Sequence, residues 1–381
     1  MAVKWPEGVL SAGVSSGIKR SGKLDLGLLV TEKPATWAGT FTQNAAAAAP
    51  VAWCRERAGS PIRAIVVNSG NANACTGRAG SHAVPVTAEA VAASVGCTPA
   101  EVLVASTGPI GVQLPIGKLI AGIPRALKEL GPEIGPFSRS ILTTDKKPKI
   151  ASAKAGGATV VGVAKGSAML APNMATMLAF VVTDADIGQG SLNAITAQAV
   201  GTSFNRICVD ACESTNDSFF VVTTGAGPLV AEDVLAGAIT SVCRELALQM
   251  VDDSEGGSRV VRIEVAGAHD DSAGAALGKA VASSALWRAA VHGGDPNWGR
   301  ILAALGSRSP QLDLDEVDVW IGSEQVFTQG EPSGDLAGAA RAMRADEILV
   351  RCVVGTGPGS AEVLSTDLSP AYVELNAGGM S

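Results

Sequence analysis

The stretch KGSAMLAPNMATMLAF, Lys165 to Phe180, joins a turn containing glycine and proline to an apolar run that predicts a buried strand. Thr176 lies where that strand would begin, directly after the small residue Ala175. A threonine in this position is usually a packing residue, because threonine occurs freely in strands. If the chain were cut before Thr176, however, this residue would become a new amino terminus and a candidate nucleophile.

Cleavage of the Ala175–Thr176 bond would give Thr176 both a nucleophile and a base. The Thr176 hydroxyl would attack the Ala175 carbonyl, the amide would become an ester, and water would release two pieces. The free α-amine, with a pKa near ~8, could then accept the hydroxyl proton in place of a histidine. The following strand would hold the nucleophile on a rigid sheet. These residues alone leave both interpretations open.

The composition excludes several classes of protein. Hydrophobic residues make up 47% of the 381 residues but aromatic residues only 4%, so the core must be built mainly from Ala, Val, Leu and Ile. The net charge of −7, without a long run of Lys or Arg, disfavours nucleic acid as a partner. The apolar runs are short and interrupted, and the first residues lack an apolar stretch of signal-peptide length. We therefore expect a cytoplasmic protein without a membrane segment.

The pattern of ligand-type residues indicates no metal or cofactor. The seven cysteines include no Cys-x-x-Cys pair and the three histidines are scattered, so the clustered ligands of a zinc site are missing. The scattered histidines also give a Ser-His-Asp triad little support. No glycine-rich nucleotide motif is present either. We expect chemistry that needs neither group.

Apolar runs alternate with helical patterns along the whole chain. Buried strands are predicted at 64–69, 101–106, 159–164, 177–185, 219–225, 260–267, 316–322 and 347–355. In the run 260–267, Val261, Ile263 and Val265 alternate with Arg262 and Glu264, which is typical of a half-exposed strand rather than a central parallel one. Helical spacing occurs at 84–96, 114–130, 191–206, 231–250 and 274–291. Because strands outnumber helices, we predict an α+β fold of layered sheets covered by helices.

The segment KGSAMLAPNMATML resembles the self-cleavage segment of the ornithine acetyltransferase/glutamate N-acetyltransferase family of arginine biosynthesis. Further motifs resemble that family in the same order along nearly the whole chain: NSGNANACTG, STGPIG, TTD, SFNRICVD with STNDS, EGGSR, DPNWGR and AYVELNA. The resemblance implies cleavage between Ala175 and Thr176, giving an α chain of residues 1–175 and a β chain of residues 176–381. It further implies an αββα-like sandwich with an N-terminal threonine nucleophile, smaller α/β lobes, and an α₂β₂ heterotetramer.

The resemblance also implies the roles of individual residues. The family's oxyanion contacts fall on Thr107 and Gly108 of STGPIG, where a hydroxyl and a backbone N–H could point at one developing charge. The substrate contacts fall on Thr143, Lys165, Thr176, Glu255, Asn376 and Ser381. A lysine suits a substrate carboxylate and a glutamate suits an ammonium group, so these charges fit small amino acids as substrates. Asn205, Asn216 and Asp217 are further candidates for shaping the pocket, without assigned roles.

Some positions depart from the family's usual pattern. Ala168 stands where the family commonly has glycine, Gly294 replaces an acidic residue, and the tail after Asn376 lacks an aromatic residue. The first departure bears on the turn before Thr176, and the last bears on how the tail closes the pocket.

The implied reaction transfers an acetyl group from Nα-acetylornithine to glutamate through an acetyl-Thr176 enzyme. The products are ornithine and N-acetylglutamate. Some family members also accept acetyl-CoA as the donor, and the sequence leaves this point open. The residues themselves leave two other interpretations. One is a self-processed amidase or aminopeptidase with water as the acceptor, and the other is a binding protein in which Thr176 only packs in the core.

Overall fold

Two mixed β-sheets organise the structure, a computed structural model that describes residues 3–170 and 177–378. The first sheet has eight strands in this part of the chain, in the order β4-β3-β2-β9-β7-β6-β5 with β1 paired to β2. Its strands are β1 (Val9–Val14), β2 (Leu26–Phe41), β3 (Ile62–Ser69), β4 (Val102–Thr107), β5 (Lys149–Ala155), β6 (Ala158–Lys165), β7 (Leu178–Thr183) and β9 (Ser218–Thr223). The predicted runs 64–69, 101–106, 159–164, 177–185 and 219–225 are confirmed as strands, whereas β1, β2 and β5 were not predicted.

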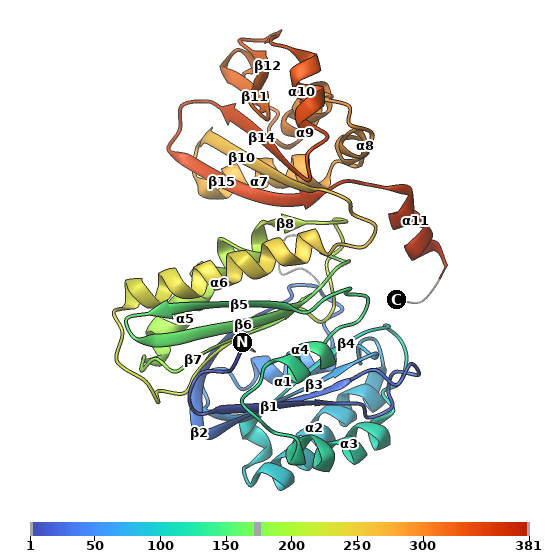
Figure 1. Cartoon of the computed structure of the whole chain (residues 1–381), viewed down its shortest axis with the longest axis vertical. Coiled ribbons are helices and arrows are strands. Elements are labelled where there is room, and N and C mark those ends of the chain that lie inside the picture. The colour runs from blue at the N-terminus through green and yellow to red at the C-terminus, as the bar shows by residue number, and fades with distance from the viewer. Residues whose placement is uncertain (1–2, 171–176, 379–381) are drawn as a thin grey trace.

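The long strand β2 belongs to both halves of this sheet. Its first part pairs with β1 and β3, and its last part, from Thr36 onward, pairs with β9. The register shifts between Val30 and Ala35, where Lys33 and Pro34 are exposed. The bulge lets the strand change direction. Figure 1 shows the result: β1, β3 and β4 form one layer, and β5, β6 and β7 lie above it.

The alternation of side chains along the strands creates a four-layer sandwich. In β7, Leu178, Phe180 and Val182 point into the core between the two halves of the sheet, while Ala179 and Val181 point into the core under the covering helices. The inner core is rich in aromatic rings, and Phe180 stacks on Phe220 with ring centroids 5.3 Å apart. Such burial is the main stabilising contribution to the fold.

Helices cover both outer faces of the sandwich. On one face lie α5 (Gln189–Gly201) and α6 (Glu232–Asp252), and on the other lie α2 (Gly77–Val95) and α3 (Ile116–Lys128). The shorter helices α1 (Ala49–Arg55) and α4 (Gly135–Ser140) place side chains in the inner core. The predicted α+β fold, with an αββα sandwich, is confirmed.

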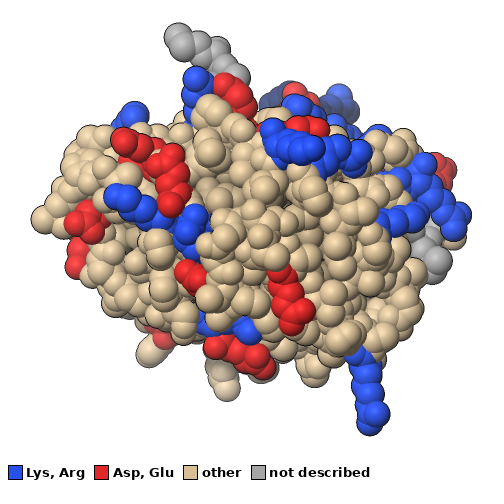
Figure 2. All heavy atoms as spheres, turned by 90° about the horizontal axis from the view of Figure 1, so that it is seen from below, with Lys and Arg blue, Asp and Glu red and all other residues tan. Residues whose placement is uncertain are grey.

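One of these helices, α6, is long and apolar enough to cross a membrane by length and composition, in the part of the chain that was described. Half of that apolar window is buried, and the buried residues pack on β5 and β6. This packing is that of a core helix. Figure 2 shows that charged residues of both signs are scattered over the face seen from below, among wide uncharged areas.

The second sheet forms a smaller α/β lobe at the other end of the molecule (Figure 1). Its strand order is β13-β12-β11-β14-β10-β15-β8. These strands are β8 (Ile207–Cys208), β10 (Val260–Ala268), β11 (Val317–Ile321), β12 (Glu324–Thr328), β13 (Glu331–Pro332), β14 (Glu347–Val354) and β15 (Gly359–Thr366). As predicted, Arg262 and Glu264 of β10 are partly exposed and Val261, Ile263 and Val265 are buried. The prediction that this run is not a central parallel strand is wrong, because β10 is an inner strand that runs parallel to β14 and antiparallel to β15.

The helices of this lobe are α7 (Asp271–Ser283), α8 (Ala285–Gly293), α9 (Trp298–Arg308) and α10 (Leu336–Ala342). The single helical pattern predicted at 274–291 is divided into two helices at Ser284. The backbone of Ser284 is extended there, and its Oγ accepts a hydrogen bond from the Trp287 N–H at 3.3 Å. The serine therefore caps a new helix. After β15, the last helix α11 (Pro370–Ala377) extends from the lobe in the direction of the sandwich (Figure 1).

Candidate active site

Strand ends that are far apart in the sequence meet at one end of the first sheet. Lys165, the last residue of β6, pairs with Leu178 at the start of β7, and Leu178 pairs with Ser218 at the start of β9. Thr107, the last residue of β4, reaches the same place, because Lys165 Nζ donates a hydrogen bond to Thr107 Oγ1 at 3.1 Å. Loops at strand ends are a usual location for functional residues.

Gly108 follows Thr107 in a turn that only glycine fits. Its φ is +138°, and a Cβ there would lie 2.4 Å from the backbone nitrogen of Asn71. The Asn71 N–H in turn donates to the Thr107 carbonyl at 3.0 Å. The STGPIG and NSGNANACTG motifs are therefore packed together backbone to backbone, and Gly108 makes that approach possible.

Asn216, which had no assigned role, holds this pair of loops in place. Its Nδ2 donates to the carbonyls of Ala72 at 2.6 Å and Ser106 at 2.8 Å. Ser106 Oγ also donates to Asn68 Oδ1 at 2.6 Å. These buried contacts fix Ser106, which precedes Thr107, and the neighbouring NSGNANACTG loop, so Thr107 lies in a rigid surrounding.

Lys165 is a buried cation, with only 4% of its surface exposed. Burial lowers its pKa, and Asp145 opposes this effect, followed more weakly by Asp217 and Glu255. Within residues 3–170 and 177–378, Lys165 forms no ion pair with a carboxylate. A substrate carboxylate would supply the missing partner.

Asp145 organises the loop that precedes β5. It accepts hydrogen bonds from the backbone of Thr143 at 3.1 Å and Gly166 at 2.7 Å, and it forms an ion pair of 2.5 Å with Lys149. Lys149 is fully buried and lies equally close to Asp253. Burial alone would raise the pKa of Asp145, but Lys165 and Lys149 outweigh it and lower that pKa to about 2. The sequence predicted a role for Thr143 but not for this ion pair, although Asp145 and Lys149 are only four residues apart.

Glu255 is a further acidic neighbour of Lys165 and is 7% exposed. Its N–H donates to the Ser167 carbonyl at 2.8 Å, which joins the EGGSR loop to the segment after β6. Its Oε2 accepts a hydrogen bond from Asn376 Nδ2 at 3.2 Å. The buried Oε1 has no hydrogen-bond partner among the described residues. An ammonium group of a substrate would satisfy it.

Asn376 reaches Glu255 because α11 is anchored beside the EGGSR loop. Gly256 has a φ of +67°, and a Cβ there would lie 2.2 Å from the Tyr372 nitrogen, so glycine is needed where the helix passes. Ser369 Oγ caps α11 through the Tyr372 N–H and also donates to the Gly256 carbonyl. The anchored helix thus brings Asn376 to Glu255, while residues 379–381 lie outside the described part of the chain.

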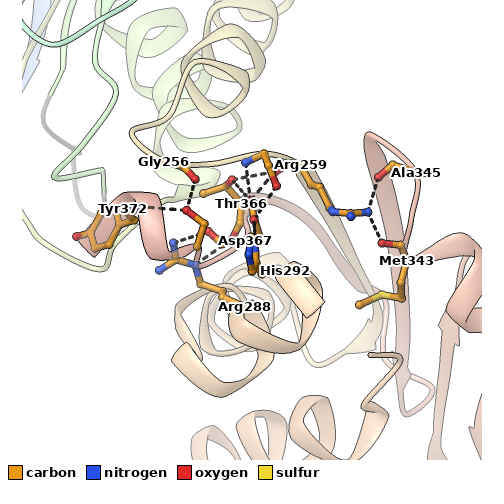
Figure 3. A network of polar contacts seen from close by, with 11 residues as sticks. Gly256, Arg259, Arg288, His292, Met343, Ala345, Thr366, Asp367 and Tyr372 are labelled. Atoms are coloured by element: carbon orange, nitrogen blue, oxygen red, sulfur yellow. Dashed lines mark hydrogen bonds and ion pairs between the residues drawn. The ribbon is translucent and has the colours of Figure 1, made fainter. Parts of the chain in front are cut away.

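The turn into α11 is held by the buried carboxylate of Asp367 (Figure 3). It accepts hydrogen bonds from the backbone of Ser258 at 2.7 Å and Arg259 at 3.2 Å, and His292 Nδ1 lies 2.8 Å from its Oδ2. Arg288 donates to the Asp367 carbonyl at 3.1 Å. This network connects α8, β15 and the EGGSR loop, and it fixes the direction in which α11 leaves the lobe.

Asp217 lies beneath the start of β7 and is fully buried. Its Oδ1 accepts a hydrogen bond from the Met177 N–H at 2.9 Å, and its Oδ2 has no hydrogen-bond partner among the described residues. Burial raises the pKa of Asp217 well above its usual range, which favours the neutral carboxyl. Ala175, Thr176 and Ser381 lie outside the described residues.

A cavity of about 710 Å³ opens beside these loops. Gly108, Thr143 and Thr144 line one part of it, and Lys19 and Lys23 line another. Its volume suits a small molecule. Among the described residues, no group of three or more His, Cys, Asp or Glu side chains is arranged to hold a metal ion.

Two departures from the family pattern fit their local backbone. Ala168 is not among the residues with a positive φ, so its Cβ causes no strain there. Gly294 ends α8 with a φ of +69° and has open space where a Cβ would be, a conformation that glycine favours.

The fold and the site together define an enzyme that acts on a small charged molecule, with a rigid hydroxyl and backbone loop beside a buried cation and a buried carboxylate. The sequence model of the ArgJ family matches residues 10–380. The chain therefore belongs to the ArgJ family, and the resemblance to the ornithine acetyltransferase family is confirmed.

Individual relatives cover nearly the whole chain. The arginine biosynthesis bifunctional protein ArgJ of Thermus thermophilus is 42% identical over 379 residues, which is 99% of each chain. The protein of the same name from Rhizobium meliloti is 40% identical over 389 residues, covering 97% of this chain and 94% of that one. A solved chain of ornithine acetyltransferase from Mycobacterium tuberculosis, complexed with ornithine, is 36% identical and covers 46% of this chain and 96% of that chain, with a TM-score of 0.40.

Proposed function

We propose that the protein transfers the acetyl group of Nα-acetylornithine to glutamate, with Thr176 as the nucleophile. The observation that carries this proposal is the meeting of Thr107, Lys165 and Glu255 at one sheet end, in a chain of the ArgJ family. The names of the relatives, a bifunctional protein of arginine biosynthesis and an ornithine acetyltransferase, support it.

In the first half-reaction, the Thr176 hydroxyl attacks the acetyl carbonyl of Nα-acetylornithine. A C–O bond forms and the C–N bond to ornithine breaks, while the hydroxyl proton passes through the Thr176 α-amine to the departing nitrogen. The Thr107 hydroxyl and the Gly108 N–H stabilise the charge on the carbonyl oxygen. Because Thr107 Oγ1 already accepts a hydrogen bond from Lys165, its own proton is free to be donated.

In the second half-reaction, the α-amine of glutamate attacks the acetyl ester. A C–N bond forms and the ester C–O bond breaks, while a proton of the attacking amine passes through the Thr176 α-amine to the Thr176 oxygen, and N-acetylglutamate leaves. Lys165 holds the α-carboxylate of each amino acid in turn, and Glu255 holds the side-chain ammonium group of ornithine. Thr143, Asn376 and Ser381 complete the substrate contacts.

The proposal includes self-cleavage into an α chain of residues 1–175 and a β chain of residues 176–381. β7 and β9 lie between β6 and β2 in one sheet, so strands from both sides of the cleavage point are hydrogen-bonded to each other. The two pieces would therefore stay together after cleavage. We further propose an α₂β₂ heterotetramer in the cytoplasm, with acetyl-CoA as a second acetyl donor.

The test is an assay of the purified protein with Nα-acetylornithine in the presence and absence of glutamate. We expect ornithine and N-acetylglutamate in equal amounts when glutamate is present, and at most one equivalent of ornithine per enzyme when it is absent. Continuous release of acetate without glutamate would instead identify an amidase with water as the acceptor. An uncleaved protein that consumes no acetylornithine would identify a binding protein.

A further inference from the structure

Lys19 lies on the wall of the cavity beside the candidate active site. It lies in the loop between β1 and β2 and lines the same cavity as Gly108 and Thr143. Its Nζ donates hydrogen bonds to the carbonyls of Leu24 at 2.8 Å and Leu142 at 2.7 Å, and Leu142 directly precedes Thr143. An ammonium group has three N–H donors, so one remains for a ligand.

The position of Lys19 is fixed by its neighbours. Its backbone N–H donates to Asp25 Oδ2 at 2.9 Å. Gly70, with a φ of +91°, packs so closely on its stem that a Cβ there would lie 2.8 Å from Lys19 Cγ. The side chain therefore approaches the cavity along a defined path, close to the oxyanion loop, since Gly70 also touches Gly108.

The charge of Lys19 is not balanced by an ion pair in the described part of the chain. Its nearest acid, Asp25, is occupied with Ser16 and with backbone N–H groups. Burial lowers the pKa of Lys19 to about 8; Asp25 and, more weakly, Asp145 oppose this, while the like charges of Lys165 and Lys23 lower it further. Lys19, Arg20 and Lys23 line the cavity, and none of its described lining residues is acidic, so the cavity favours the binding of an anion.

The acidic neighbours of Lys19 differ from those of Lys165, although Asp145 acts on both lysines. The largest effects on the pKa of Lys165 include that of Glu255, whereas those on Lys19 come from Asp25, Lys165, Lys23 and Asp145. Glu255 does not line the cavity that contains Lys19. Glu255 therefore acts on Lys165, whereas Lys19 lies in a cavity whose described lining residues include no acid.

We propose that Lys19 binds the side-chain carboxylate of the acceptor amino acid and so selects glutamate. This inference rests on the proposed function. Ornithine and glutamate take turns in one site, and both present an α-carboxylate to Lys165. Their side chains differ, because one ends in an ammonium group and the other in a carboxylate. Glu255 attracts the first and repels the second, so glutamate needs a cation at the other end, and Lys19 provides it.

The experiment separates the two half-reactions in Lys19→Met, Lys19→Arg and the control Lys118→Met. Lys118 is exposed and donates to the Gly17 carbonyl of the same loop at 2.9 Å, but it does not line the cavity. In Lys19→Met, we expect the KM for glutamate to rise about 10- to 100-fold, the effect of losing one hydrogen bond to a charged group. The burst of ornithine from acetylornithine alone should change less than about twofold. Lys19→Arg should recover much of the affinity.

The uncharged acceptor glutamine gives an independent measurement on the wild-type protein, should Lys19→Met fail to fold. The preference for glutamate over glutamine should decline as the pH rises through about 8, where Lys19 loses its proton. Lys165 acts on the α-carboxylate of both acceptors, so its titration cancels in the ratio. An unchanged glutamate KM in folded Lys19→Met, equal losses in both half-reactions, or a preference independent of pH would overturn the inference. A wild-type protein that releases no ornithine burst would instead refute the proposed function.

Discussion

Lys165 Nζ donates a hydrogen bond of 3.1 Å to Thr107 Oγ1, joining two residues that are 58 positions apart. The contact connects the buried cation of the site to the loop proposed to hold the oxyanion. It also orients the threonine, because a hydroxyl that accepts from lysine can turn its proton toward the reacting carbonyl.

Removal of the Thr107 hydroxyl should slow both self-cleavage and acetyl transfer. Thr107→Val keeps the shape of the residue in β4 but removes the donor, so we expect both rates to fall about 10²- to 10³-fold with little change in KM. Pulse-labelled precursor on a denaturing gel reports cleavage, and ornithine release reports transfer. Thr107→Ser should retain much of both rates. As a control, Thr196→Val removes a buried hydroxyl that bonds only within α5. A Thr107→Val protein with normal rates would show the loop to be an ordinary turn.

Glu255→Gln should weaken the donor more than the acceptor. The buried Oε1 has no partner among the described residues, and an amide there cannot form an ion pair with the ammonium group of acetylornithine. We expect the KM for acetylornithine to rise about tenfold or more, and the KM for glutamate to change much less. Steady-state kinetics with each substrate varied in turn provide the measurement. A larger effect on glutamate would reverse the assigned ends of the site.

Lys149→Met should strongly destabilise the fold. It leaves the carboxylates of Asp145 and Asp253 buried without their cation, a change that usually costs about 3–5 kcal/mol. The free energy of unfolding in urea measures the effect. The matched control is Lys147→Met, which breaks an exposed pair with Asp252 and should cost less than about 1 kcal/mol. Equal losses in the two variants would contradict the role of the buried pair.

The stabilising effect of the Asp145 carboxylate should be lost in acid. Its pKa of about 2 in the folded protein lies below the value of about 3.9 in an unfolded chain, so its stabilising effect is complete above pH 4 to 5. The effect is lost as the pH falls toward 2, and amounts to roughly 2–3 kcal/mol. Urea titrations at several pH values should show this loss in the wild type and a flatter profile in Asp145→Asn. The same slope in both proteins would assign the acid sensitivity to other carboxylates.

The sequence predicted those parts of the fold that have a strong local pattern. Continuous apolar runs such as 64–69 and 177–185 became strands, but β2 was missed because Glu32, Lys33 and Pro34 interrupt its pattern at the bulge. The helix pattern at 274–291 hid the break at Ser284, since the capping hydrogen bond depends on backbone geometry.

The candidate site was predictable only where a motif marked it. Thr107, Lys165, Glu255 and Asn376 were selected by resemblance, and their mutual contacts follow from strand pairing and from the anchored tail. Lys19 was not found, because it lies in a loop that looks like a solvated surface segment. The proposed role of Lys19 depends on its charge interaction with Lys165, a residue that only tertiary packing brings near.

The central claim is that Thr176 carries the acetyl group between the two substrates. The most direct test is mass spectrometry after a rapid acid quench of the protein incubated with Nα-acetylornithine alone. We predict two fragments, of which the one beginning Thr-Met-Leu-Ala-Phe gains one acetyl group that glutamate then removes. An uncleaved chain that is nevertheless active, or a cleaved enzyme that turns over without ever carrying the acetyl group on that fragment, would contradict the account.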